Sequence, residues 1–313
     1  MQPLNVGNGH RMQALPAGIR TVLIEVAERC GIAIDDAQLV HQHSNSAVAL
    51  PTSGLLVRIA SNPNALQQLM MSVAVTRWLV SRGYPAVEPA AVAPFQVADR
   101  AVTVWKLLDV VDHPRGTGTE LGRLLRLLHE EPSPPIELKP LSDPLDGVSR
   151  ALANHPDGMR PQDRTWLLSK IDGFRFEWTS LRTHLPLGLV HGDAHSNNLI
   201  RVRDGGVVLS DWDHVAVGPR EWDLVQPFYM QRRFGRHTEE ELQDFAVAYG
   251  WDVRDWAGFE TLIQIREVFG LSPYVRRAPV EKWARNEVAH RLRTLRAGDT
   301  STRWSGPPRP SAS

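Results

Sequence analysis

The chain has 313 residues, 42% of them hydrophobic, which is enough for one large domain or two lobes. With 35 basic and 35 acidic residues the formal net charge is zero, so the composition gives no reason to expect nucleic acid or an anionic membrane as a partner. A single cysteine, Cys30, excludes a disulfide within the chain and favours the cytoplasm, and no segment has the pattern of a signal peptide or a membrane-spanning helix.

Residues 1–108 are predicted to form a lobe built on a small antiparallel sheet. Apolar residues at helical spacing predict a helix over residues 14–30. Asn62 and Pro63 have the chemistry of a helix start, and the long helix that follows is expected to end at Gly83. Short strands separated by turn-forming sequences are expected over residues 39–42, 46–50, 54–60 and 101–108.

Residues 109–300 are predicted to form a larger, mainly helical lobe. Helical patterns cover residues 121–128, 164–185 and much of 221–295. Residues 188–211 read as strand, loop, strand, turn, strand, with a hairpin turn at 204–206. The Ser- and Pro-rich end, residues 301–313, is expected to be disordered. This order of elements predicts an α+β fold with two unequal lobes and a ligand cleft between them.

Polar residues gather at the ends of the apolar strands within residues 188–211. Asp193 and Asn198 share one loop, and Asp211 follows the last strand. Phosphoryl transfer needs a carboxylate to accept the hydroxyl proton, oxygen ligands for Mg²⁺ and a cation on the phosphates. Asp193 can be that carboxylate, and Asn198 and Asp211 can hold Mg²⁺.

The motif His191-Gly192-Asp193, followed by Asn198 and then by Asp211 after a hydrophobic strand, resembles that of the aminoglycoside phosphotransferase family, relatives of protein kinases. The resemblance covers roughly residues 39–293. It implies a bilobal protein-kinase-like fold and transfer of the γ-phosphoryl group of ATP or GTP to a hydroxyl of a small molecule. It also implies that Asp193 is the catalytic base and that Asn198 and Asp211 bind Mg²⁺.

The same resemblance implies roles for three further parts of the chain. The backbone around Val104, Trp105 and Lys106, in the strand between the lobes, is expected to bind the nucleotide base. Asn45, in a turn between the first strands, either touches the nucleotide or is a plain turn residue. Asp223, after the metal aspartate, is expected to brace the catalytic loop.

The phosphate-binding cation departs from the family pattern. No lysine precedes Lys106, so Arg58 is the only candidate for the contact that a strand lysine usually makes with the phosphates, and its fork suits that role. The glutamate that usually anchors this cation is missing as well, with Ser72 at about its place on the long helix. Either the phosphate itself or an acid from the other lobe could orient Arg58.

Several neighbouring residues keep open interpretations. Asp213 is either a second metal contact or a turn residue. His191 is expected to orient the loop through hydrogen bonds. His195 is expected to be a loop residue or to act only indirectly. The acceptor is expected to bind in the helical lobe, and it could be an antibiotic, a sugar, an amino alcohol or another metabolite. Residues there that could meet an amine-bearing acceptor, or serve only in packing, are Glu221, Trp222, Tyr229 and Glu267.

Two other functions compete with the kinase hypothesis. The Arg58 replacement and the missing helix acid would suit a kinase-shaped protein that binds nucleotide without catalysis. Alternatively, a metal-dependent hydrolase could use ligands from the set His191, Asp193, His195, Asp211, Asp213 and His214. That reading leaves Asn198 and the β-rich lobe without a role.

Overall fold

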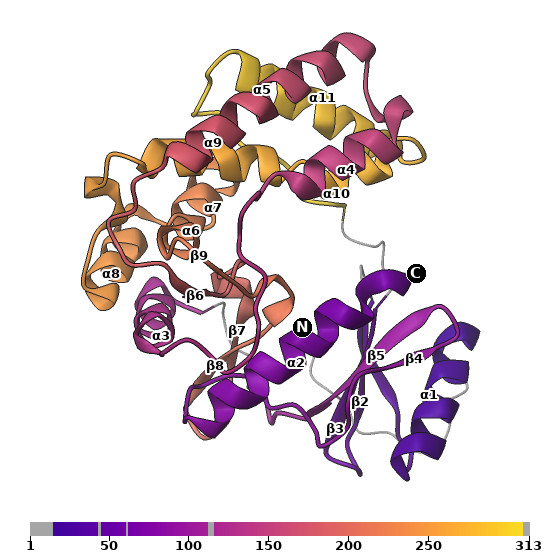
Figure 1. Ribbon diagram of the computed structural model, residues 1–313. Helices are drawn as coiled ribbons and strands as arrows, with labels where there is room; N and C mark the ends of the chain where they lie inside the picture. Colours follow the sequence, from indigo (N-terminus) through magenta and orange to yellow (C-terminus); the bar gives the residue numbers. More distant parts are fainter. Residues whose placement is uncertain (1–14, 43–44, 61, 112–115, 309–313) are drawn as a thin grey trace. The chain divides into compact units, whose positions relative to one another are not determined.

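The structure, a computed structural model, describes residues 15–42, 45–60, 62–111 and 116–308. The chain divides into two compact units (Figure 1). The first, here called the sheet unit, comprises Met1–Gly116, Ser133–Leu138 and Asn197–Val215. The second, the helical unit, comprises Thr117–Pro132, Lys139–Ser196 and Ala216–Ser313. The sequence predicted a single boundary between the lobes near residue 108. The structure differs from this prediction, because residues 197–215 group with the sheet unit.

The sheet unit is built on a five-stranded sheet with strand order β1-β2-β3-β5-β4, in which all neighbouring strands are antiparallel. A separate antiparallel hairpin, β7–β8, belongs to the same unit. The elements of the unit are α1 (Ala17–Cys30), β1 (Gln38–Gln42), β2 (Asn45–Leu50), β3 (Leu55–Ala60), α2 (Leu66–Ser81), β4 (Phe95–Val97), β5 (Arg100–Lys106), β7 (Leu199–Arg201) and β8 (Val207–Leu209).

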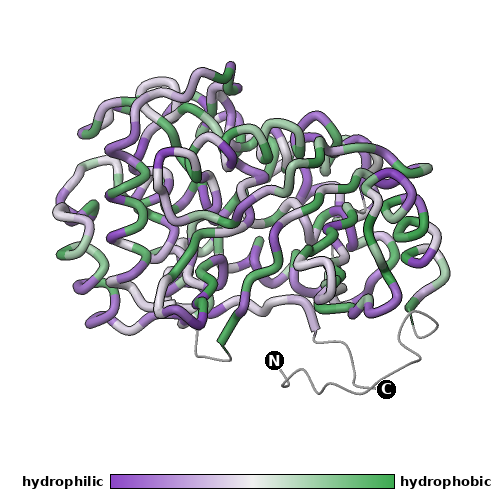
Figure 2. Tube along the Cα trace, turned by 90° about the horizontal axis from the view of Figure 1, so that it is seen from below, coloured by the Kyte–Doolittle hydropathy of each residue, from purple (hydrophilic) through white to green (hydrophobic). Residues whose placement is uncertain are grey.

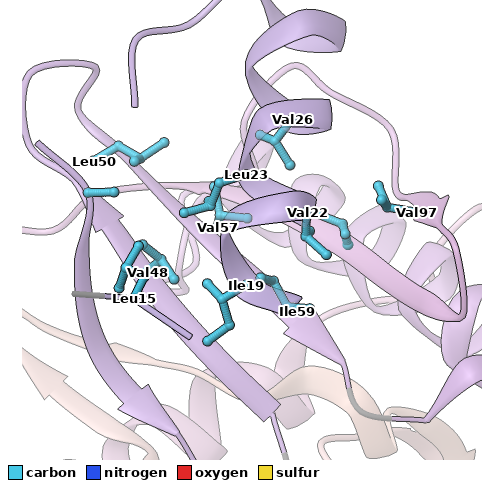
Figure 3. Close-up of a cluster of buried hydrophobic side chains, with 12 residues drawn as sticks. Leu15, Ile19, Val22, Leu23, Val26, Val48, Leu50, Val57, Ile59 and Val97 are labelled. Carbon is cyan, nitrogen blue, oxygen red and sulfur yellow. The ribbon is translucent and has the colours of Figure 1, made fainter. Parts of the chain in front are cut away.

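Helix α1 covers one face of the sheet. Its apolar side packs against side chains from β2 and β3, among them Val48, Val57 and Ile59 (Figure 3). Because successive residues of a strand point to opposite faces, Arg58, between Val57 and Ile59, points to the face that α1 does not cover. Arg58 therefore lies on the face of the sheet that is turned toward helix α2. Leu69 of this helix packs with Ala60 and Ala101.

The helical unit joins nine helices and one short strand pair, β6 with β9, among the residues that the structure describes. Helices α3 and α8 both begin with a capping box. The elements are α3 (Gly118–Glu130), α4 (Asp146–Asn154), α5 (Pro161–Ser180), β6 (Gly188–Val190), β9 (Ala216–Gly218), α6 (Glu221–Leu224), α7 (Gln226–Phe234), α8 (Glu239–Tyr249), α9 (Phe259–Phe269), α10 (Ser272–Arg277) and α11 (Lys282–Arg296).

Hydrophobic and hydrophilic residues alternate over short distances along the chain (Figure 2). Within the described residues no helix has both the length and the apolar character needed to cross a membrane.

The predicted helices and strands are present, but the strand expected over residues 101–108 ends at Lys106, and β4 and α4 were not expected. Two further differences concern α5 and the chain end. The long helix expected over residues 164–185 is α5, Pro161–Ser180, since Pro161 supplies a favourable first helical residue. The expectation of disorder from residue 301 is wrong as far as residue 308. Trp304 is buried and its indole Nε1 donates to Thr294 Oγ1 at 3.0 Å, so an aromatic side chain anchors a segment whose Ser and Pro content suggested disorder. Residues 309–313 lie outside the described part.

Candidate active site

The loop that carries Asp193 starts at the end of strand β6 and is held by a buried carboxylate. The backbone N–H groups of His191 and Gly192 donate to the two oxygens of Asp223 at 2.7 and 2.8 Å. Gly192 has a φ of 87°, a left-handed conformation that favours glycine, which explains the glycine of the motif. Asp223 therefore lies where the resemblance implied, as a brace beneath the loop.

A buried polar chain supports Asp223. His129 Nε2 lies 3.3 Å from the Asp223 carboxylate, and His129 Nδ1 lies 2.9 Å from the hydroxyl of Tyr249. Burial opposes the charge on Asp223, but the hydrogen bond and charge of His129 and the loop amide outweigh it and lower the pKa of the carboxyl below its usual range. Burial is also the main reason that the pKa of Tyr249 is raised. Asp223 is thus ionised and fully hydrogen-bonded at neutral pH.

The side chain of Asp193 is oriented but accessible. Its Oδ1 accepts a hydrogen bond of 2.9 Å from Gln226 Nε2, and 28% of its side chain remains exposed. His191 Nδ1 accepts from the Asp193 amide at 3.3 Å, which fits the orienting role expected of that histidine. His195 Nε2 lies 3.8 Å from Asp193 Oδ2. A fixed carboxylate that solvent can reach is able to accept a proton from a bound hydroxyl.

Two residues that support this loop are not evident from the motifs. The indole of Trp222 donates from Nε1 to the Gly192 carbonyl at 3.1 Å, and the guanidinium of Arg266 lies 3.6 Å above the Trp222 ring. Arg266 is fully buried, and burial lowers its pKa to about 10. The sequence does hold a signal for it, because Arg266 interrupts the apolar stretch of α9 between Ile265 and Val268.

The predicted metal ligands belong to the β7–β8 hairpin. Asn198 precedes β7, and its carbonyl accepts hydrogen bonds of 2.9 Å from both the amide and the hydroxyl of Ser210. Asp211 directly follows Ser210 and has φ 65° and ψ 58°, a left-handed conformation that is rare outside glycine. Such an outlier costs on the order of 1–3 kcal/mol and is typical of functional positions.

Arg58 contacts two acids in the turn that follows strand β8. Its Nη1 and Nη2 donate to the two oxygens of Asp213 at 2.8 and 2.6 Å, and Nη2 also donates to Asp211 at 3.0 Å. Burial opposes the charge on Arg58, but Asp213 and Asp211 outweigh it and raise its pKa above the ordinary value. An acid, one of the two anchors left open by the sequence, therefore contacts Arg58, and it belongs to the same unit as Arg58.

The donor set at Asn198 and Asp211 suits a hard cation. Mg²⁺ prefers oxygen ligands and is commonly held by one or two carboxylates together with substrate phosphates, so a carboxamide and a half-exposed carboxylate fit it. Across the described ranges, no three His, Cys, Asp or Glu side chains gather into a metal-binding group. The hydrolase hypothesis requires such a group and finds no support there.

The backbone expected to bind the nucleotide base is partly used by the segment between α2 and β4. The Val104 carbonyl accepts from Ala90 N at 3.0 Å, and the Lys106 amide donates to the Glu88 carbonyl at 2.8 Å. The ammonium of Lys106 pairs with the Glu88 carboxylate. Trp105 is buried and bonds Thr103 Oγ1 through its indole at 2.8 Å, so its ring belongs to the core of the unit.

Asn45 and the acceptor candidates also have definite places. Asn45 is the first residue of β2 and pairs with Ala60, rather than lying within the turn. The four candidates in the helical unit are all buried. The Glu221 carboxylate accepts the amides of His184 and Leu185 at 2.6 and 2.7 Å, and Glu267 pairs with Arg233 at 2.6 Å. Burial raises the pKa values of Glu267 and Tyr229. These contacts show Glu221 and Glu267 serving the packing of the unit.

Comparison with protein families gives one match over most of the chain. The sequence model of the phosphotransferase enzyme family (APH) matches residues 37–262, which include every residue predicted to serve in catalysis, nucleotide binding or metal binding. A search among curated proteins gave no match. The match confirms the resemblance drawn from the His191–Asp211 motif.

Solved structures resemble the chain in fold at low sequence identity. Amicoumacin kinase hAmiN, in complex with AMP-PNP and Ca²⁺, is 13% identical, with a TM-score of 0.64 over 90% of this chain and 95% of its own. A choline/ethanolamine kinase family protein from Mesorhizobium loti is 14% identical, with a TM-score of 0.62 over 88% and 94%. Aminoglycoside phosphotransferase APH(3'')-Id from Streptomyces rimosus is 16% identical, with a TM-score of 0.60 over 79% and 97%. The α+β, kinase-like fold expected from the sequence is therefore confirmed.

Proposed function

The chain belongs to the phosphotransferase enzyme family (APH), and from this premise we propose that it transfers the γ-phosphoryl group of ATP or GTP to a hydroxyl of a small molecule. The observation that carries the proposal is the braced loop of Asp193. Its amides are fixed by a buried, ionised Asp223, while the Asp193 carboxylate keeps an exposed edge. This arrangement supports Asp193 as the catalytic base, since a base must be held in place and still reach its proton.

The residues of the chain divide the remaining tasks. Asp193 accepts the acceptor's hydroxyl proton as the oxygen attacks the γ-phosphorus, and the bond from the γ-phosphorus to the bridging oxygen breaks, so that the nucleoside diphosphate leaves. Asn198 and Asp211 would hold Mg²⁺, which when bound supplies positive charge that offsets the charge of the phosphates. Arg58 contacts the α- and β-phosphates through its guanidinium fork.

The nucleotide base is expected to meet backbone groups at the end of β5. The Val104 carbonyl and the Lys106 amide already bond the backbone of Ala90 and Glu88, and the Leu107 amide donates to the Gly54 carbonyl at 2.9 Å. We therefore expect the main contacts at the carbonyls of Lys106 and Leu107 and at Leu108. Asn45, at the start of β2, keeps its proposed contact with the nucleotide.

The acceptor is proposed to be a hydroxyl-bearing small molecule, in a cytoplasmic setting. The relatives with a similar fold include enzymes named for amicoumacin, choline or ethanolamine, and aminoglycosides. An antibiotic, a sugar and an amino alcohol therefore all belong in a first acceptor screen.

Calorimetric binding of ATP and GTP, with and without Mg²⁺, tests the nucleotide part of the proposal. We expect binding that strengthens with Mg²⁺ in the wild type and loses that dependence in Asp211→Ala. Absence of binding by a folded protein would overturn the assignment.

An acceptor screen that measures the nucleoside diphosphate released then tests catalysis. Asp193→Asn should bind nucleotide like the wild type and lose about 10²–10⁴-fold in rate, the usual contribution of a general base. Nucleotide binding with no turnover on any acceptor, and no difference between wild type and Asp193→Asn, would favour the alternative of a non-catalytic nucleotide-binding protein.

A further inference from the structure

The turn after strand β8 holds Arg58 by two unequal contacts. Asp213 meets the guanidinium with both oxygens, at 2.8 and 2.6 Å, while Asp211 meets it with one, at 3.0 Å. The side chains of Arg58 and Asp213 are 17% and 16% exposed, whereas that of Asp211 is 46% exposed. Arg58 and Asp213 thus form the shielded, two-point pair, and Asp211 keeps one side open to solvent.

Helix α2 contributes to this arrangement without an acid. Its residue Ser72 is fully buried, and its hydroxyl has no hydrogen-bond partner among the residues that the structure describes. The helix contacts the turn in another way, because Gln68 Nε2 donates to the backbone carbonyl of Asp213 at 2.6 Å. Helix α2 therefore contacts the turn after β8 through Gln68, and Asp213 of this turn pairs with Arg58.

We propose that Asp213 is the positioning residue for Arg58 and does not serve as a second metal ligand. The inference rests on the proposed function and deepens it, because it separates the two acids of the turn by role. Asp213 fixes the phosphate-binding cation, and Asp211 is left to the metal. The left-handed backbone of Asp211, φ 65°, places both carboxylates near one guanidinium although they lie only two residues apart.

The chemistry of the guanidinium allows both states of the site. A guanidinium carries five N–H donors in a planar fork, so it can keep a two-point contact with one carboxylate while it donates to a phosphate. When Asp211 turns to a cation, Arg58 loses one hydrogen bond and keeps the two from Asp213. Without Asp213, Arg58 would lose its shielded partner and sample other rotamers before each binding event.

A double-mutant cycle on metal-free nucleotide binding tests this role. ATP and GTP are titrated by calorimetry in the presence of EDTA into the wild type, Arg58→Gln, Asp213→Asn and the double variant. We expect Asp213→Asn to weaken binding about tenfold in the wild type, the effect of losing a charge-assisted contact, and less than twofold in the Arg58→Gln background. Asp109→Asn is the matched control, because Asp109 forms an exposed ion pair with Arg203 in the same unit, and it should change binding less than twofold.

The contrary result has its own signature. If Asp213 is a metal ligand, Asp213→Asn will leave metal-free binding unchanged and will weaken Mn²⁺ binding to the nucleotide complex by the same factor with and without Arg58. That outcome overturns the proposal while the proposed phosphotransferase function stands. Failure of the folded wild type to bind either nucleotide would instead remove the proposed function itself.

Thermal unfolding of the nucleotide-free protein gives a second readout that needs no ligand. Because Asp213 neutralises a shielded arginine, Asp213→Asn should lower the unfolding temperature of the wild type more than that of Arg58→Gln. An equal decrease in both backgrounds would contradict the pairing. A single variant that does not fold, beside a double variant that does, would support it.

Discussion

Asp223 illustrates how one buried side chain can connect stability with the active site. Its carboxylate accepts two loop amides and contacts His129, all inside the helical unit. A buried carboxylate is tolerated because each of these contacts favours its charged form. The residue is therefore expected to contribute to folding and to the geometry of Asp193 together.

Asp223→Asn should lower the free energy of unfolding by about 2–3 kcal/mol at neutral pH, because the carboxamide keeps one acceptor oxygen and leaves one of the two loop N–H groups facing an NH₂ donor. Since the pKa of Asp223 is lowered by folding, this contribution is complete above the ordinary carboxyl value of about 3.9 and is lost as the pH falls toward the lower folded value. Urea unfolding at neutral pH and near pH 3 measures it. If the free energies of unfolding of the wild type and Asp223→Asn differ as much near pH 3 as at neutral pH, the charge of Asp223 does not provide this stability.

Arg266 poses the opposite case, a buried charge that is incompletely paired. Its Nη2 donates to the Trp222 carbonyl at 2.7 Å, while Nε and Nη1 have no hydrogen-bond partner among the described residues. Because burial lowers its pKa to about 10, the folded protein binds this proton less tightly than the unfolded chain, and the charge weakens the fold at neutral pH.

We expect Arg266→Met to leave the free energy of unfolding within about 1 kcal/mol of the wild type, since an apolar side chain of similar length avoids the desolvation cost. The same variant should slow phosphoryl transfer about tenfold or more, because Arg266 supports Trp222 and Trp222 holds the Gly192 carbonyl. Chemical unfolding and steady-state kinetics measure the two effects. Large destabilisation with unchanged turnover would show that the residue serves folding alone.

Helices α3 and α8 show how closely two elements can approach when glycine lies between them. A Cβ atom on Gly122 of α3 would lie 2.5 Å from the Phe245 carbonyl oxygen of α8, and one on Gly118 would lie 2.0 Å from that of Glu241. His129, near the end of α3, is the residue that contacts Asp223. The close packing of this pair therefore fixes the support beneath the loop of Asp193.

Gly122→Ala should destabilise the protein by about 1–3 kcal/mol, because the rigid backbone of α8 has to move. Gly173→Ala in α5 is the matched control, since a Cβ there meets nothing within 4 Å and alanine is the better helix former. It should stabilise by about 0.5–1 kcal/mol. Chemical unfolding of both variants checks the pair, and the same sign for both would refute the packing argument.

Helix α2 offers a second test at this scale. Gln68→Ala removes the hydrogen bond to the Asp213 carbonyl and should weaken metal-free nucleotide binding about threefold, because the turn that holds Arg58 becomes less ordered. Gln67→Ala, at the neighbouring exposed position of the same helix, is the control and should have no effect. Calorimetry on both variants gives the comparison, and equal effects would count against a role for Gln68.

At the scale of the whole molecule, the chain end closes the core of the helical unit. Trp304 lies between the guanidinium groups of Arg233 and Arg291, 4.5 and 4.7 Å from its ring centroid, and its amide donates to the Arg233 carbonyl at 2.6 Å. The Arg291 guanidinium and the Tyr274 hydroxyl both donate to the carbonyl of Ser305. The segment up to residue 308 thus belongs to the folded unit.

Trp304→Ala is expected to lower the free energy of unfolding by about 3–5 kcal/mol, the usual cost of deleting a buried aromatic side chain. Phe176→Ala serves as control, because that side chain is 74% exposed, and it should stay within about 0.5 kcal/mol. Thermal and chemical unfolding measure both. If Trp304→Ala were as stable as the control, the chain end would not contribute to the core.

The sequence by itself determined the α+β fold, most of its elements and the family motif, although it did not indicate β4 or α4. These features are local, since strands, caps and turns depend on residue spacing, and the motif at Asp193, Asn198 and Asp211 is contiguous enough to recognise. Even the departure at Arg58 could be read from the absence of lysine before residue 106.

Only the tertiary structure decided which groups meet across long separations. The pairing of Arg58 with Asp213 spans 155 residues, and Arg266 reaches the Trp222 carbonyl from 44 residues away. It also placed Trp304 in the core and paired the backbone of Val104 and Lys106 with that of Ala90 and Glu88. Burial and ion pairing arise from packing among distant segments, and residue spacing along the chain carries no information about which of several acids will reach a given cation.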